Sequence, residues 1–194
     1  MTIKGLSFIF FATVSLLYSQ TINRYGSTAA NFLEIGVGSA NTAMGDAGVT
    51  FATGPTSAYW NPATLAFIAR NENSFMMQPW ILDINMMFAG STIHINRVGT
   101  FAISITHMNY GDMEVTTMSQ QDGTGEMFVA NEYSAALTFS RKIVQRFSFG
   151  ASAKIISSKI WHSSASAFAL DLGTLVNTSF LSPNGSAKDG MRIG

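Results

Sequence analysis

Cysteine is absent from this chain of 194 residues, which excludes disulfide bonds, thiolate catalysis and cysteine-ligated metals. Charge is scarce as well: 11% of residues are charged, against about 25% in an ordinary soluble protein, whereas 47% are hydrophobic. Lys and Arg total only 11, are balanced by 11 Asp and Glu, and form no patch, so no nucleic-acid partner is expected. So little charge indicates an outer surface that does not face water.

Long apolar runs are missing beyond the first residues, and none approaches the roughly 18 residues of a membrane-spanning helix. Residues 1–19 have the pattern of a secretory signal peptide, with Lys4 as the positive charge, Leu6–Tyr18 as the apolar core and cleavage after Ser19. A buried helix or a membrane anchor is the alternative. We therefore expect an exported protein without a helical membrane span.

Candidate catalytic and ligand-binding groups are few. His94, His107 and His162 lack the spacing of metal ligands, and no Ser-His-Asp set can be argued from the sequence. Gly36-Val37-Gly38 begins like a dinucleotide fingerprint, but Asn41 stands where the third glycine is needed and no βαβ unit surrounds it. We expect no enzyme activity, no cofactor and no metal site.

From about residue 72 onward, apolar side chains alternate with small or polar ones, which is the period of a β-strand. The stretch TFAISITHM, for example, places Phe and Ile on one face and Ala, Ser and Thr on the other. We predict strands at residues 72–79, 84–95, 100–117, 129–141, 147–161 and 166–178, and the start of a seventh near Met191. The fold class is therefore all-β.

Two all-β architectures are consistent with this alternation. A soluble sandwich would carry Lys, Glu and Asp on its water face. Here the second face is Ser, Ala, Thr and Gly, and between Phe75 and Tyr110 the only charged residues are Asp83 and Arg97, both at predicted turns. The lengths of most predicted strands also suit a tilted membrane strand, which needs about 9–11 residues in the apolar zone. We predict an antiparallel transmembrane β-barrel, and keep an exported soluble β-sandwich that binds a ligand as the alternative of another class.

Loop lengths predict an orientation, because outer-membrane barrels place short turns in the periplasm and long loops outside. Residues 96–99 and 142–146 are short connections, whereas 118–128 is longer and polar. This assignment also separates charge of opposite sign. The inner end receives Arg97, Arg141, Lys142 and Arg146, and the outer end receives Asp112, Glu114, Asp122, Glu126 and Glu132.

Lys154 and Asp171 both point away from the predicted lipid face, where a lysine would cost about 2–4 kcal/mol at midplane. In a hairpin that closes around His162 and Ser163, Lys154 lies opposite Asp171, and Ile155 pairs with Leu170. We predict a cross-strand ion pair in the lumen. Two separately hydrated charges are the alternative.

The segment FLEIGVGSANTAMGDAGV…SAYWNPATLA is similar to the amino-terminal segment of the PorV/PorQ family, which belongs with the FadL-like (OmpP1–FadL–TodX) outer-membrane proteins of Gram-negative bacteria. YGDMEVTT, GTGEMF, RFSFGASAKIISSKIWHSSASAFALDLGT and GMRIG match the same family in the same order. The resemblance covers nearly all of the mature sequence. One departure is visible: family members usually have Gly-Met-Gly-Gly-Ala where this chain has Ala43-Met44-Gly45-Asp46-Ala47.

The resemblance implies a barrel of about 14 strands with an amino-terminal plug in its lumen. Because six strands and part of a seventh fit in 194 residues, we expect the first half of such a protein. The predicted parts are a signal peptide at 1–19, a plug at 20–70 and half of a barrel at 71–194.

In the plug, small residues would let a non-helical chain fold inside the lumen, and four glycines allow tight turns: Gly36, Gly38, Gly45 and Gly48. Pro62 fixes one φ angle and restricts Asn61 to extended conformations. Trp60 is then expected to wedge against the inner wall where the plug joins the first strand. A surface turn with an incidental tryptophan is the alternative.

A non-enzymatic role in the outer membrane follows from the resemblance. The PorV-like function is type IX secretion, in which the barrel takes exported cargo from the translocon to the surface attachment machinery. The alternative is a FadL-like channel for long-chain fatty acids or other hydrophobic small molecules. The expected partners are outer-membrane lipid, together with secretion-machinery proteins and exported cargo, or with those hydrophobic molecules.

Overall fold

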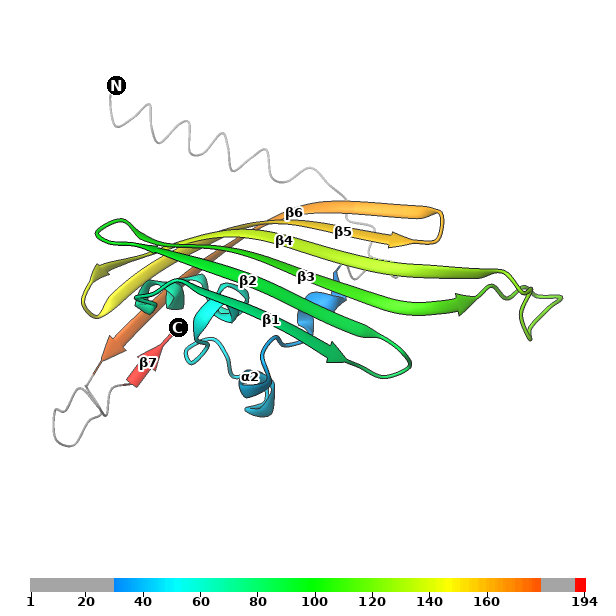
Figure 1. Ribbon diagram of the computed structural model, residues 1–194, viewed down its shortest axis with the longest axis horizontal. Coiled ribbons are helices and arrows are strands. Elements are labelled where there is room, and N and C mark those ends of the chain that lie inside the picture. The colour runs from blue at the N-terminus through cyan, green and yellow to red at the C-terminus, as the bar shows by residue number, and fades with distance from the viewer. Residues whose placement is uncertain (1–29, 179–190) are drawn as a thin grey trace, which may run out of the picture.

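The computed structural model describes residues 30–178 and 191–194, and it consists mainly of one antiparallel sheet (Figure 1). The sheet has seven strands in the order β1-β2-β3-β4-β5-β6-β7, so each strand pairs with its neighbours in sequence. The strands are β1 (Glu72–Pro79), β2 (Asn85–Ile95), β3 (Gly99–Glu114), β4 (Met127–Val144), β5 (Phe147–Ile160), β6 (Ser163–Thr178) and β7 (Met191–Ile193). The all-β prediction is confirmed, and the curved, open sheet is part of a β-barrel wall.

The sheet is covered on one face by the inner segment (residues 30–71), which lies under the arch of strands in Figure 1. Its short helices are η2 (Asn31–Glu34), α2 (Ser39–Ala43), η3 (Gly54–Thr56), α3 (Ser57–Trp60) and η4 (Pro62–Phe67). Two small apolar clusters join it to the sheet: Val37 packs with Met86 and Phe88, and Leu65 packs with Ala58 and Ala102. These clusters position the inner segment over β2 and β3.

The two faces of the sheet differ in chemistry as the alternation predicts. On the covered face of β3, Ala102, Ser104 and Thr106 are buried. On the opposite face, large apolar side chains are exposed throughout the wall: Phe75, Met77, Ile93, Ile103, Ile105, Leu137, Ile155, Phe168, Leu170 and Leu172. In the described residues no second sheet packs on these side chains, because a single sheet contains all seven strands. A water-soluble protein would instead cover its apolar face and expose its polar face.

Three strand boundaries differ from the prediction by three residues, and one of them is the start of β6, which lies at Ser163 instead of residue 166. Residues 142–144 were expected to belong to the turn before β5, but they continue β4, with a register irregularity between Lys142 and Val144. The connection to β5 is only Gln145–Arg146. Residues 115–117 were expected in β3 but belong to the following loop, where Val115 N–H donates to Glu126 O at 2.8 Å.

The register of the β5–β6 hairpin also differs from the prediction, by two residues. Its turn is Trp161–His162, so that Ile160 pairs with Ser163, and Trp161 has a left-handed φ of 49°. Two-residue hairpin turns require such positive φ values. The observed pairs are Lys154 with Ala169, Ile155 with Phe168, and Ser152 with Asp171. A shift of two keeps every side chain on its predicted face.

The turns divide between two ends of the sheet. Residues 96–98 and 145–146 connect strands at one end, and residues 80–84, 115–126 and 161–162 at the other. None of the helices in the described ranges is long and apolar enough to cross a membrane. The predicted signal peptide, residues 1–19, lies outside the described residues.

Candidate functional site

The closest approach of the inner segment to the wall is at η4, which lies across β5 and β6 where each strand has a glycine. A Cβ atom on Gly150 would lie 2.4 Å from the carbonyl carbon of Pro62, and one on Gly173 would lie 2.2 Å from Asn61 Oδ1. Real Cβ atoms essentially never approach so closely. The two glycines therefore form a recess in the wall that η4 occupies.

Hydrogen bonds fix η4 in this recess. The hydroxyls of Ser148 and Ser140 donate to the carbonyl oxygen of Ala63 at 2.8 and 3.3 Å. Asn61 Nδ2 donates to Thr174 O at 3.0 Å, while its Oδ1 accepts from the N–H of Ala63 at 3.0 Å and so caps η4. Asn61 therefore starts the helix and binds it to β6 with one side chain. Pro62 follows at the first helical position, where its missing N–H costs nothing.

Trp60 has a different role from the predicted one. Its indole Nε1 donates to Val37 O at 2.7 Å, and its ring lies against Gly48, where a Cβ atom would be 2.4 Å from Cδ2. The neighbouring ring of Tyr59 meets it edge-on at 5.4 Å between centroids. These contacts join two parts of the inner segment to each other. The wall contact expected of Trp60 is made by Asn61 and Pro62, and with β5 and β6 rather than with the first strand.

Tyr59 closes the inner segment on its other side. Its hydroxyl donates to Leu33 O and to Ile35 O, the second at 2.9 Å. Burial first, and then the nearby carboxylates of Asp46 and Glu34, together raise the pKa of Tyr59 to about 12. The phenol therefore stays protonated and keeps donating at any ordinary pH.

The predicted glycines serve two different purposes. Gly38 and Gly45 have positive φ values of 96° and 69°, which favour glycine. Gly36, like Gly48, lies at a close approach, since its Cβ would be 2.1 Å from Asp46 Oδ1. Asp46 itself has φ 63°. It adopts a left-handed conformation at the position where the PorV/PorQ pattern has glycine, and Asp is one of the few other residues that do so readily.

Lys154 and Asp171 are brought together on the covered face. Lys154 Nζ lies 2.5 Å from Asp171 Oδ2, with exposed side-chain fractions of 15% and 36%. The contact is diagonal rather than directly cross-strand, because of the shifted register, and the long lysine side chain bridges the offset. Lys154 Nζ also lies 5.9 Å from the ring centroid of Tyr59. The pair thus stands between the wall and the inner segment.

The wall residues of the recess were not singled out from the sequence. Gly150, Gly173, Ser140 and Ser148 all fall on the face opposite the apolar one, and only their type could have identified them. A glycine inside a strand often marks a close backbone approach. Which backbone approaches could not be read from the strand itself.

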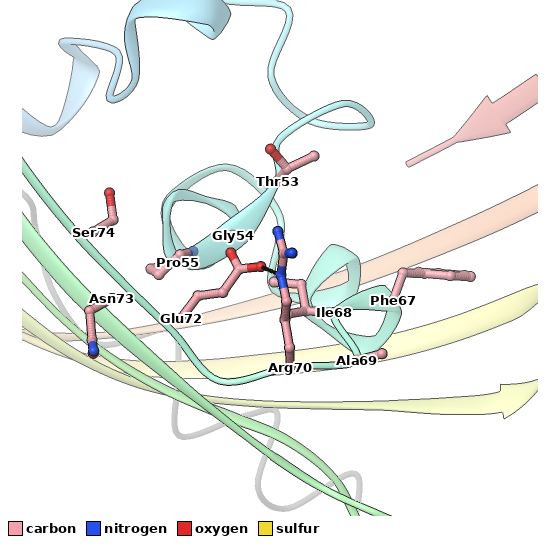
Figure 2. A pocket seen from close by; sticks show the side chains of 10 residues that line it. All are labelled: Thr53, Gly54, Pro55, Phe67, Ile68, Ala69, Arg70, Glu72, Asn73 and Ser74. Carbon is pink, nitrogen blue, oxygen red and sulfur yellow. Dashed lines mark hydrogen bonds and ion pairs between the residues drawn. The ribbon is translucent and has the colours of Figure 1, made fainter.

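A pocket of about 620 Å³ opens at the end of η4, between the inner segment and the edge strand β1 (Figure 2). Arg70 and Glu72 point toward each other in it and form an ion pair below Gly54. Glu72 is therefore already paired. Within the described residues no group of three or more His, Asp or Glu side chains could hold a metal ion.

Comparison with known proteins assigns this arrangement to a family. Residues 18–181 match the family model described as type IX secretion system protein PorV. A comparison with curated proteins found no match. The matched range covers both the inner segment and six strands of the wall, including every residue of the recess. The chain belongs to the PorV family of type IX secretion system proteins.

Proposed function

We propose that this protein is an outer-membrane β-barrel of type IX secretion that receives exported cargo from the translocon and passes it to the surface attachment machinery. The observation that carries the proposal is the family match over residues 18–181. The exposed apolar face of the sheet supports the membrane location, because hydrocarbon stabilises such a surface and water does not. We propose no enzymatic activity.

We further propose the division of the chain into a signal peptide (1–19), a lumenal plug (20–70) and the first half of a barrel wall (71–194). Irregular backbone at membrane depth is tolerated where protein surrounds it. The bonds from Ser148 and Asn61 that hold η4 to the wall support a plug that is built into the barrel. Lys154 and Asp171 would then be a lumenal ion pair that holds two charges away from lipid.

The chemistry of the covered face favours cargo delivery over a channel for hydrophobic molecules. Sites for apolar ligands are lined mainly by apolar and aromatic side chains. Here the buried wall residues include many hydroxyls: Thr92, Thr100, Ser104, Thr106, Ser134, Thr138, Ser140, Ser148 and Ser152. Apolar side chains such as Met86, Phe88 and Leu175 are buried on the same face, but the hydroxyl residues outnumber the apolar ones, so a long-chain fatty acid would gain less here than from an apolar lining. FadL-like uptake is therefore the competing outcome of the test.

The test is deletion of the gene, followed by two assays on the same cells: the amount of cargo attached at the surface, and the uptake of long-chain fatty acids. We expect the loss of surface cargo with normal uptake. Normal secretion with lost uptake would contradict the proposal and favour the channel. Fractionation gives an independent check, since the product should sediment with outer membranes and show heat-modifiable mobility on gels.

A further inference from the structure

Four polar side chains interrupt the apolar face of the sheet where β3 and β4 approach the loop that joins them. We call them the polar border: His107 and Asn109 of β3, and Asn131 and Tyr133 of β4. The register pairs His107 with Tyr133 and Asn109 with Asn131. All four alternate in step with the exposed apolar residues of the same strands, so they point away from the inner segment.

The polar border is fixed by its own contacts. The ring of His107 stacks on that of Tyr133, with 4.4 Å between centroids and an interplanar angle of 13°. Asn131 Oδ1 lies 3.2 Å from His107 Nε2 and accepts from Asn109 Nδ2 at 2.9 Å. Asn109 Oδ1 accepts from the N–H of Gly111 at 2.8 Å. In the part of the chain that the structure describes, the Tyr133 hydroxyl and the Asn131 amide nitrogen have no hydrogen-bond partner, so they are available to a group outside the sheet.

Beside the polar border, the exposed face is apolar in three successive register rows. Each row crosses four strands, β3, β4, β5 and β6, in that order. The rows are Phe101, Phe139, Ala151 and Leu172; Ile103, Leu137, Ala153 and Leu170; and Ile105, Ala135, Ile155 and Phe168. The two rows of the polar border continue on β5 and β6 with hydroxyl and charged side chains: Ser157, Ser166, Lys159 and Ser164. The change from apolar to polar therefore occurs at the same register level on all four strands.

Arg141 marks the other limit of this apolar band. It follows Phe139 on the exposed face of β4 and pairs with Phe149 of β5. An arginine is costly at the centre of a lipid-facing wall and costs little near the interface. From Asn131 to Arg141 the strand rises about 34 Å, at about 3.4 Å per residue. At a tilt of about 40° this is about 26 Å along the barrel axis, and the apolar band of outer-membrane barrels is about 25 Å tall. The two limits on β4 are therefore one hydrocarbon thickness apart.

We propose that the polar border contacts the headgroup layer of one lipid leaflet, that Arg141 lies at the headgroup layer of the other, and that hydrocarbon covers only the wall between them. Amide and imidazole groups are costly in hydrocarbon unless they are hydrogen-bonded, whereas headgroups and water supply the missing partners. Tyrosine is enriched at such interfaces. This inference rests on the proposed membrane location and adds which part of the wall the bilayer covers.

The β3–β4 hairpin then projects beyond the bilayer. Its last pair, Glu114 with Met127, lies past the last pairs that β3 and β4 make with β2 and β5 (Figure 1). Val129, on the exposed face of this projection, is 37% exposed, whereas Leu137 within the apolar band is 62% exposed. Without lipid, Leu137 would therefore be the more accessible of the two. The proposal reverses this order, because lipid covers Leu137 and water reaches Val129.

Thiol labelling of isolated outer-membrane fragments tests this placement, because both membrane surfaces are open to the reagent there. Single cysteines replace Val129 and, separately, Leu137 in the full-length protein, and a charged, membrane-impermeant maleimide is added. A maleimide reacts with the thiolate, which does not form in apolar surroundings. Val129→Cys should therefore react at least about tenfold faster than Leu137→Cys, against the order of their exposure in the lipid-free fold.

Two controls accompany the pair. Ala135→Cys places the thiol on the same face of β4, at the last apolar position before Tyr133, and should react as slowly as Leu137→Cys. After denaturation all three cysteines should react at one rate, which shows that the thiols are intact. If Leu137→Cys lacks the heat-modifiable mobility of a folded barrel, Ile103→Cys replaces it, since Ile103 pairs with Leu137 in the same row.

The outcomes distinguish this inference from the membrane location on which it rests. Fast labelling at both Val129 and Leu137 would overturn the two together. Slow labelling at both, in a protein that sediments with outer membranes, would overturn the inference alone, because the covered region would then extend past the polar border. Fast labelling at Ala135 with slow labelling at Leu137 would also overturn it, because the boundary would then lie within the apolar band.

Discussion

Replacing Gly150 by alanine should lift η4 out of its recess. The added Cβ would lie 2.4 Å from the Pro62 carbonyl carbon, whereas ordinary contacts begin near 3.4 Å, so the helix must retreat by about 1 Å. The hydrogen bond from Ser148 to Ala63 O, now 2.8 Å, would lengthen to about 3.8 Å and break. Overpacking costs about 1–3 kcal/mol, and the lost bond about 1 kcal/mol. The docked state should lose about 2–4 kcal/mol in total.

Thiol labelling can measure this loss, because the chain has no cysteine of its own. Ala66, at the end of η4, is buried in the docked state, so an Ala66→Cys reporter should react slowly with a maleimide. Adding Gly150→Ala should raise the labelling rate about 30-fold or more, the factor that corresponds to 2 kcal/mol. Gly125→Ala is the control, since nothing lies within 4 Å of that position; its φ of 80°, unlike the φ of Gly150, strains an alanine, so this variant tests whether backbone strain in a distant loop alone raises the rate. An unchanged rate with Gly150→Ala would refute the close-approach interpretation.

Three further predictions concern the inner segment and the ion pair. Since the pKa of Tyr59 is raised to about 12, the protonated phenol should stabilise the inner segment fully below pH 10, and this contribution should disappear between pH 10 and 12. A 295 nm difference titration against Tyr59→Phe should show one phenol that ionises near pH 12. Ionisation near pH 10 would contradict the burial of this phenol. Lys154→Met should destabilise the fold by about 1–2 kcal/mol, because it leaves Asp171 unpaired. In thermal unfolding, the double variant Lys154→Met/Asp171→Leu should recover most of this lost stability. Additive losses would mean that the two charges do not interact. Trp60→Phe should lower stability by about 1 kcal/mol, because it removes the N–H that donates to Val37 O; no change in denaturant midpoint would contradict that role.

The wall could be predicted from the sequence because the alternation of apolar with small or polar side chains along a membrane strand shows which face each residue occupies. The exposed apolar positions Ile103, Leu137 and Leu170 face away from the inner segment as their spacing requires. Periodicity defines faces but not register. It therefore predicted that Lys154 and Asp171 share a face, yet it placed the turn one residue too late, and so misassigned the residues that pair across the hairpin.

The packing of the inner segment could not be predicted in the same way. Its helices are three to six residues long, too short for a 3.6-residue period to be visible. Trp60 was expected at the wall because it is large. The structure instead places the ring of Trp60 against Gly48 within the segment, and it sets Asn61 and Pro62 against Gly150 and Gly173 where two backbones meet. This fit depends on the shapes of two segments that are distant in the sequence, and neither segment alone shows which one it will meet.

The recess also constrains the order of assembly. The wall groups that hydrogen-bond to η4, from Ser140 to Thr174, are synthesised about 80–110 residues after it. The earlier segment η4 therefore lacks these hydrogen-bonding partners until the β4–β5 and β5–β6 hairpins have formed. Docking is then a late event that only a correctly registered sheet can complete, and it acts as a check on the strands that were made after it.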